Sequence, residues 1–134
     1  MNTSLKQAFK ELSKALTHLH KDLLMLEAKR LEDQLGQKLG PYELLNYSLN
    51  DASMAWLRKL SELIVNIDTI IDESPNLSAQ DSQRVASEVL AVIEKPKDPD
   101  SEFWRKYQSY LTNPDIIMKH ARVKDVLVPL IPSN

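Results

Sequence analysis

The apolar residues of the first 35 positions recur every three or four residues, which is the period of one face of an α-helix. The first row comprises Leu5, Phe9, Leu12, Leu16, Leu19, Leu23 and Leu26. A second row continues the apolar face after the first has ended, and it comprises Leu24, Ala28, Leu31 and Leu35. The shift indicates that the helix changes neighbours along its length. The pattern predicts a long helix over about 4–35, begun by Thr3 or Ser4 and ended by Gly36.

A short accessory helix is predicted from Pro41 to Leu49, because proline suits the first helical turn and Gly40 breaks the chain just before it. Its apolar residues are Leu44, Leu45 and Leu49. We expect these three side chains to face the interior of the protein.

The following segment, which extends to about Glu73, is apolar over most of its helical circumference. Asn50 or Asp51 can cap its start. One seam comprises Leu57, Leu60, Ile64, Ile67 and Ile71, and it is widened by Trp56, Leu63 and Ile70. Helices that are apolar on so many sides lie inside a bundle. The sequence therefore predicts that this is the central core helix.

Further helices are predicted over 79–94, over about 101–111, and from Asn113 and Pro114 onward. Ser78 and Asp81 form a capping-box pattern before the first of them. The charged, proline-containing stretch 95–100 is predicted to be a linker. On the last helix the residues expected to face inward are Ile116, Ile117, Ala121, Val123 and Val126. Pro129 prevents that helix from continuing into the C-terminal segment.

These elements define the fold class. The chain has 134 residues, the size of one domain, and only two glycines, which argues against a turn-rich β-sandwich or barrel. Short connections between helices imply antiparallel neighbours. We therefore predict an all-α fold in which residues 1–134 form a single up-and-down bundle of four to six helices, with a long N-terminal helix and a short accessory helix.

Charge and composition reduce the range of partners and cellular locations to be expected. The formal net charge of −2 lacks the basic excess of a nucleic-acid-binding domain, so nucleic acid is not favoured as a partner. A lysine row at Lys6, Lys10, Lys14 and Lys21 is better explained as a solvated helix face. No apolar run is long enough to span a membrane, and the N-terminus interleaves charged with apolar residues. We expect a cytoplasmic protein without membrane contact.

The stretch from Trp56 to Asp68, together with Leu19-His20-Lys21 and the residues from Gly40 to Leu45, resembles a family of small bacterial all-α proteins. Its members carry a core helix of the pattern WLR-x-LSELIV-x-ID after a long N-terminal helix. The resemblance covers about the first 75 residues. It implies an α-helical fold and a bacterial origin, and it implies no activity.

Arg58, Ser61 and Asp68 lie along one side of the predicted core helix. One interpretation is a polar ligand pocket in which Arg58 holds an anionic group, Asp68 is its counter-group and His20 contributes from the N-terminal helix. The other is a network of polar side chains that joins neighbouring helices and fixes the geometry of the bundle. The second interpretation is favoured.

Recognisable catalytic and metal-binding patterns are absent from the sequence. Without cysteine there is no thiolate nucleophile or cysteine zinc site, and no histidine follows a glutamate by three positions as in di-iron bundles. His18 and Asp22 are better explained as an i, i+4 pair than as metal ligands. The sequence predicts no catalytic residue, no metal and no cofactor.

Two features favour contacts with another protein. Trp104 points away from its aromatic neighbours, and the C-terminal segment with Val128, Leu130 and Ile131 is apolar and interrupted by proline. This segment either packs on its own bundle, which is favoured, or docks on a second subunit. The predicted function is a non-enzymatic interaction or assembly module that forms a homodimer. The alternative is a binding protein or enzyme for a small anionic ligand around Arg58 and Asp68.

Overall fold

The protein is described by a computed structural model that covers residues 2–74, 76–94 and 98–131. Within these ranges the chain forms α1 (Asn2–Leu35), α2 (Pro41–Asn50), α3 (Arg58–Glu73), α4 (Ala79–Ile93), α5 (Glu102–Tyr110) and α6 (Pro114–Leu127). Two 3₁₀ turns, η1 (Ala52–Leu57) and η2 (Val128–Leu130), precede α3 and follow α6. The all-α prediction is confirmed. The predicted linker 95–100 falls largely on residues 95–97, outside the described residues.

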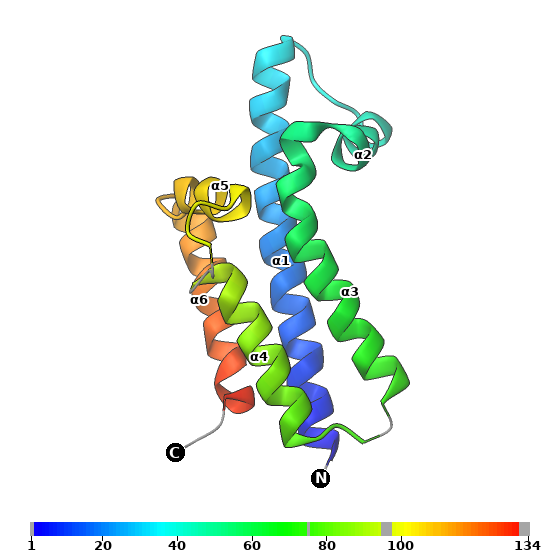
Figure 1. The fold of residues 1–134 in the computed structure, drawn as a ribbon. Coiled ribbons are helices and arrows are strands. Elements are labelled where there is room, and N and C mark those ends of the chain that lie inside the picture. The colour runs from blue at the N-terminus through cyan, green and yellow to red at the C-terminus, as the bar shows by residue number, and fades with distance from the viewer. Residues whose placement is uncertain (1, 75, 95–97, 132–134) are drawn as a thin grey trace.

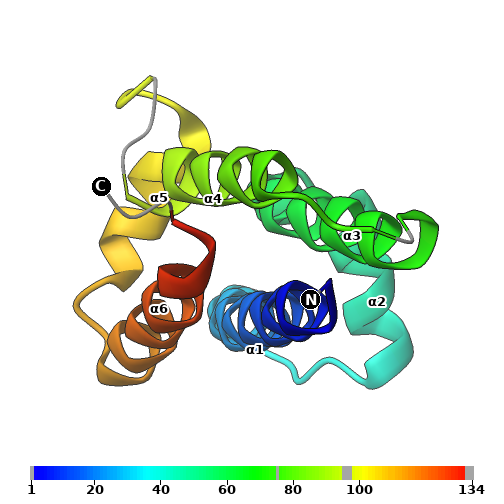
Figure 2. The ribbon, with the colours of Figure 1, turned by 90° about the horizontal axis from the view of Figure 1, so that it is seen from below.

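The helices form an up-and-down bundle (Figure 1). α1 spans the length of the molecule, α3 returns beside it, α4 rises again and α6 descends, while α2 and α5 connect the longer helices. Seen along its axis, α1 has α6 on one side and α3 on the other (Figure 2).

The centre of the bundle is α1, so the prediction of a central helix over 51–73 is wrong. In the first two thirds of α1 the side chains of Phe9, Leu12, Leu16, Leu19 and Leu23 are fully buried. The segment 51–73 divides into η1 and α3, and α3 has neighbours on only part of its circumference. Val65 of α3 is consequently 63% exposed, although Leu60, Ile67 and Ile71 are buried.

Local capping explains where several helices begin and end. The backbone N–H of Asp81 donates to the Ser78 hydroxyl and the N–H of Ser78 donates to the Asp81 carboxylate, which confirms the predicted capping box. These bonds hold the pKa of Asp81 below its usual value. Gly36 ends α1 with φ at +71°, a left-handed conformation that favours glycine.

The prediction that the leucines of the short helix α2 face the interior is wrong for two of the three. Leu45 and Leu49, expected inside, are 55% and 59% exposed, and none of the ten residues of α2, all of which the structure describes, is buried. The helix packs on η1 with its opposite side, where Leu44, Tyr47 and Ser48 are half-buried. Propensity therefore predicts this helix correctly, while its orientation depends on the neighbours it meets.

The inner side of α6 was predicted only in part. Ile116, Val123 and Val126 are buried, but Ile117 is 47% exposed and Ala121 is exposed as well. The buried side of α6 packs mainly against α1, which leaves a narrower apolar seam than the sequence suggests.

Candidate functional site

The four residues of the predicted polar pocket do not meet in one site; only His20 and Ser61 are in contact with each other. The Arg58 guanidinium is exposed, and its Nη2 donates to the backbone carbonyl of Leu49 at 2.6 Å. Leu49 belongs to the last turn of α2, where unpaired carbonyl groups and the helix dipole favour a cation. Arg58 therefore holds the C-terminal end of α2 rather than facing Asp68.

The other three residues join α1 to α3. Ser61 Oγ lies 3.0 Å from His20 Nε2, and the Ser13 hydroxyl donates to Asp68 Oδ1 at 2.6 Å. The two bonds are separated by seven residues on each helix, as expected where antiparallel helices contact along one seam. Burial lowers the pKa of His20. The arrangement agrees with the interpretation of these side chains as links between helices.

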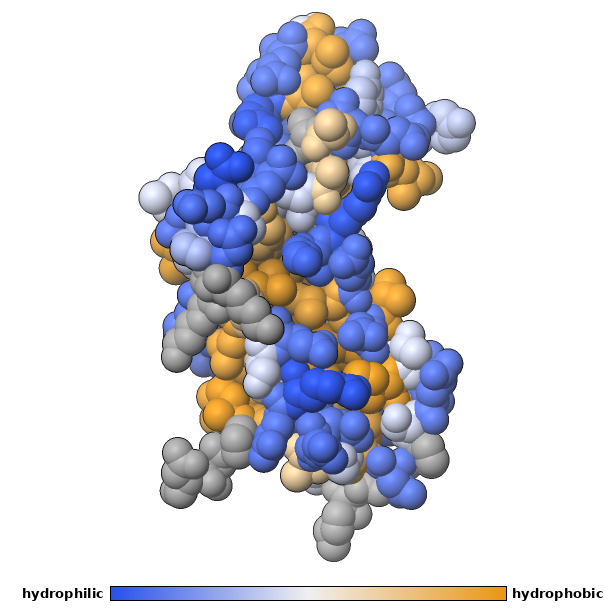
Figure 3. Space-filling view, viewed as in Figure 1, coloured by the Kyte–Doolittle hydropathy of each residue, from blue (hydrophilic) through white to orange (hydrophobic). Residues whose placement is uncertain are grey.

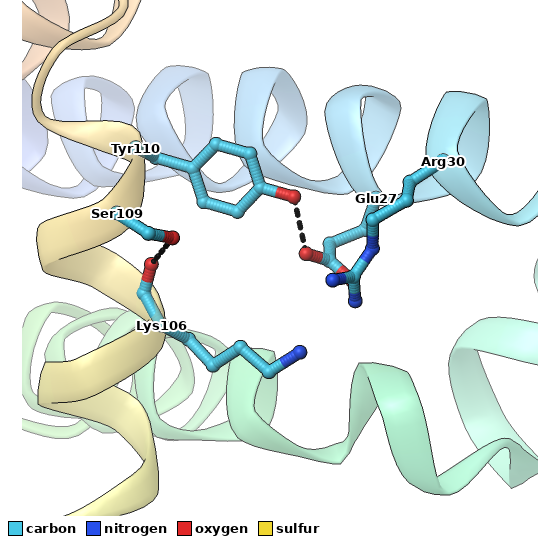
Figure 4. A network of polar contacts seen from close by, with 5 residues as sticks. All are labelled: Glu27, Arg30, Lys106, Ser109 and Tyr110. Carbon is cyan, nitrogen blue, oxygen red and sulfur yellow. Dashed lines mark hydrogen bonds and ion pairs between the residues drawn. The ribbon is translucent and has the colours of Figure 1, made fainter.

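A buried carboxylate lies where α1 passes α5 (Figure 4). Glu27 is 1% exposed; the Tyr110 hydroxyl donates to its Oε1, and the Arg30 Nη2 lies 2.8 Å from its Oε2. Burial, together with the bond to Glu27, raises the pKa of Tyr110. Glu27 is not among the residues predicted from the sequence. A signal was present, since Glu27 follows Leu23 by four residues and so lies on the buried face of the helix.

Aromatic rings pack around this carboxylate. Trp56 of η1 stacks on Tyr110 with ring centroids 6.0 Å apart and contacts Phe103 at 5.5 Å. The Trp56 Nε1 is buried and has no hydrogen-bond partner among the described residues. These contacts anchor η1, and with it the start of α3, against α5.

A second polar pair joins α5 to α6. The Tyr107 hydroxyl lies 2.6 Å from His120 Nδ1. Burial raises the pKa of Tyr107 and lowers that of His120, while Glu94 opposes the shift of His120 and Lys124 adds to it. Both groups are therefore neutral parts of the packing near neutral pH.

The described ranges contain no cluster of three or more His, Asp and Glu side chains that could hold a metal ion. His18 and Asp22 do not pair as predicted: the Asp22 carboxylate accepts from Lys119 Nζ of α6 at 3.0 Å. Within the same ranges no helix combines the length and apolarity needed to cross a bilayer.

Solvent-exposed apolar side chains gather on the outer side of α2. We call Tyr42, Leu45 and Leu49 the α2 stripe; they are 84%, 55% and 59% exposed. Hydrophobic patches are visible at this end of the molecule among hydrophilic residues (Figure 3).

A groove lies next to the stripe, between the last turns of α1 and the segment that leads into α2. Its volume is about 650 Å³. We call it the α1 groove; it is lined by Met25, Ala28, Lys29, Glu32, Asp33, Gly36, Gln37, Lys38, Leu39 and Leu44. The Glu32 carboxylate accepts from the backbone N–H of Leu39 at 2.6 Å, and this bond fixes the wall of the groove opposite α1.

Another hollow, of about 590 Å³, lies between α3, α4 and the start of α5. Leu63, Val92 and Phe103 contribute apolar surface, and Glu62 and Glu88 are among its charged residues. Arg58, Ser61 and Asp68 do not line it, so it is not the polar pocket predicted from the sequence.

The C-terminal segment packs on its own bundle, which was the favoured prediction, and this removes Leu130 from the interface residues suggested there. Leu130 is 2% exposed and packs within the protein's own core, because η2 contacts α1, α4 and α6. The segment therefore packs on its own bundle, and Leu130 is not available for a partner. Val128 and Ile131 are 65% and 43% exposed, and Trp104 is half-buried against Tyr107.

Comparisons with known protein families, curated proteins and solved structures give no match for this chain. The family resemblance of residues 56–68 stays a prediction.

Proposed function

We propose that this protein is a non-enzymatic helical-bundle module that self-associates, as a homodimer, through the end of the molecule formed by α2 and the last turns of α1. The observation that carries the proposal is the α2 stripe, in which three large apolar side chains are more than half exposed on a helix without a buried residue. We further propose that the protein is bacterial, which the resemblance of residues 56–68 supports. We also propose that it is cytoplasmic, because the N-terminus interleaves charged with apolar residues.

The energetics of α2 support this proposal. A helix of ten residues is marginal in water, and most helices are stabilised by packing an apolar face. In α2 the three residues of the stripe face outward while Leu44 and Tyr47 are only half-buried. Polar contacts hold the two ends of the helix: Glu43 accepts from Gly40 N at its start, and Arg58 donates to Leu49 at its end. Burying one leucine side chain contributes about 1.5–3 kcal/mol. A second surface over the stripe would therefore stabilise α2 considerably.

The alternative function, an anionic-ligand site around Arg58 and Asp68, has less support. Asp68 and His20 are engaged between α1 and α3, and Arg58 is engaged with α2. The geometry gives these groups helix-joining roles.

The test is solution mass by light scattering over about a hundredfold range of protein concentration. We expect the wild-type mass to rise toward that of a dimer, and the double variant Leu45→Ser, Leu49→Ser to stay monomeric. The matched control is Val128→Ser, since Val128 is 65% exposed on the C-terminal segment. A wild-type protein that is monomeric throughout contradicts the proposal. Dissociation by Val128→Ser but not by the α2 variant would assign the interface to the C-terminal segment.

A further inference from the structure

We propose that the hollow between α3, α4 and the start of α5 binds a small organic cation, in which an ammonium group is attached to an apolar body. We call it the α3–α4 hollow. The inference goes beyond the proposed function and does not depend on self-association, because no residue of α2 lines this hollow.

Apolar side chains form much of the wall of the α3–α4 hollow. Leu63 of α3, with Ala91 and Val92 of α4, lines it, and all three are half-buried, so that part of each side chain still faces the hollow. Figure 3, which views this side of the molecule, shows hydrophobic surface bordered by hydrophilic residues. The volume of about 590 Å³ lies in the range of sites that hold small molecules. The hollow can therefore cover an apolar body of modest size.

The charged residues that line the hollow are not balanced. Three of them are carboxylates, Glu62, Glu88 and Asp98, and Lys59 is the single cation among them. The lining thus has an excess of two negative charges. A potential of this sign attracts cations and repels anions.

Two of these carboxylates are available to a ligand. Neither Glu62 of α3 nor Glu88 of α4 forms an ion pair or hydrogen bond with any residue in the described ranges. At the two ends of α4, by contrast, Asp81 accepts from the N–H of Ser78, and Glu94 pairs with Lys124 at 3.0 Å. The acidic groups of the hollow are therefore not already neutralised by its walls.

The third carboxylate is held in place by its own turn. Asp98 Oδ1 accepts from the N–H of Asp100 at 3.0 Å, and the Asp98 carbonyl accepts from the N–H of Ser101. A carboxylate has two oxygens and about four acceptor sites, so these bonds leave Asp98 able to accept from an ammonium group. The turn fixes this acceptor beside the start of α5.

The combination of apolar wall and unpaired carboxylates selects the chemical class of the ligand. A neutral apolar molecule would remove water from Glu62 and Glu88 without replacing its hydrogen bonds, which is unfavourable. An anion would meet the excess negative charge. An organic cation buries its apolar body against Leu63 and Val92 and donates to the carboxylates at the same time.

The test is an NMR titration that follows the backbone amides of the full chain with three probes. Phenethylammonium carries both an apolar body and a cation, hydrocinnamate carries the same body with a carboxylate, and methylammonium lacks the body. We expect saturable shifts for phenethylammonium at amides around Leu63 and Ala91, with a dissociation constant on the order of millimolar for so small a probe. Hydrocinnamate should bind at least about tenfold more weakly, and methylammonium should not saturate.

Variants locate the site. The double variant Glu62→Gln, Glu88→Gln should weaken phenethylammonium binding about tenfold, and the difference should shrink at high salt. The matched control is Asp72→Asn, Glu73→Gln, which removes the same number of charges from exposed positions of α3 outside the hollow. Ala91→Leu keeps every charge but fills part of the hollow, and it should also weaken binding.

Each outcome decides the inference. Equal affinity for phenethylammonium and hydrocinnamate would overturn the assignment to cations, and the absence of saturable binding would overturn the site. Equal weakening by the hollow variant and by its control would show attraction to net charge alone, which also contradicts the site. The variant Leu45→Ser, Leu49→Ser should bind phenethylammonium as the wild type does, so that a monomeric wild type contradicts the proposed function and leaves this inference intact.

Discussion

The two ends of α1 follow the same helical period but have different surroundings. Between Phe9 and Leu23 the seam is covered by α3 and α6, and its side chains are fully buried. After Leu23 only part of the helix is covered: Glu27 and Ala28 are still buried, but Met25 and Leu35 are 51% and 43% exposed. The last turns of α1 extend past α5 (Figure 1). The helix α2, which accompanies this second part, buries none of its described residues.

This contrast shows that the helical period identifies an apolar face but not what covers that face. In the packed part, the face is covered by helices of the same chain. In the α1–α2 part, an equally apolar helix turns its stripe to solvent. An exposed surface of this kind is typical of an interaction site.

Leucine truncation should show the largest contrast between the two regions. Leu16→Ala removes a fully buried side chain and should lower the free energy of unfolding by about 2–5 kcal/mol. Leu45→Ala should change it by less than about 0.5 kcal/mol in the monomer, because the side chain already contacts water. Denaturant unfolding at low protein concentration measures both values. Equal losses would mean that α2 is packed as tightly as α1.

The next largest loss of stability is expected at Glu27, the buried carboxylate where the packed part of α1 meets the α1–α2 part. Tyr110→Phe removes a hydrogen bond to a charged group that is 1% exposed, and should cost about 1.5–3 kcal/mol. Tyr42→Phe is the matched control, with a side chain 84% exposed, and should leave the monomer's free energy of unfolding unchanged. A Tyr110→Phe variant as stable as the wild type would show that Glu27 is not held by this bond.

The capping box at the start of α4 predicts a smaller loss. Ser78→Ala removes the acceptor for the Asp81 N–H and should cost about 1 kcal/mol. Ser109→Ala, at an exposed serine within α5, serves as the control for loss of a hydroxyl. Thermal unfolding of the two variants should therefore give a lower Tm only for Ser78→Ala.

Two histidines of the packed region should make the free energy of unfolding depend on pH. Burial lowers the pKa of His20 and His120 in the folded protein, so below their ordinary value of 6.5 the unfolded chain binds protons more readily. The stability that these groups contribute is present above pH 6.5 and is lost as the pH falls through their folded pKa values. Unfolding curves between pH 7 and 5 should show this decline, and His20→Gln should reduce it.

The sequence predicted the helices well because their signals are local. Gly36, the Ser78 capping box and Pro114 mark ends within a few residues, and each is found where expected. The wrong predictions concern tertiary neighbours. The orientation of α2 depends on its contact with η1, and the burial of Glu27 depends on Tyr110, which lies 83 residues away.

The candidate site was predicted less well for the same reason. Arg58 and Asp68 share one side of a helix in the sequence, yet each meets a different element: Leu49 of α2 and Ser13 of α1. Spacing along one helix cannot reveal which other helix supplies the partner. Of the predicted pocket, only His20 and Ser61 are in contact with each other.

Amide hydrogen exchange at low and high protein concentration can show whether α2 is covered only in the dimer, because it follows α1 and α2 in one sample. We expect amides in the last turns of α2 to exchange rapidly in dilute protein and to be protected at high concentration, while amides around Leu16 are protected in both. Exchange in α2 that does not change with concentration, in a protein whose mass does change, would contradict the claim that α2 forms the interface.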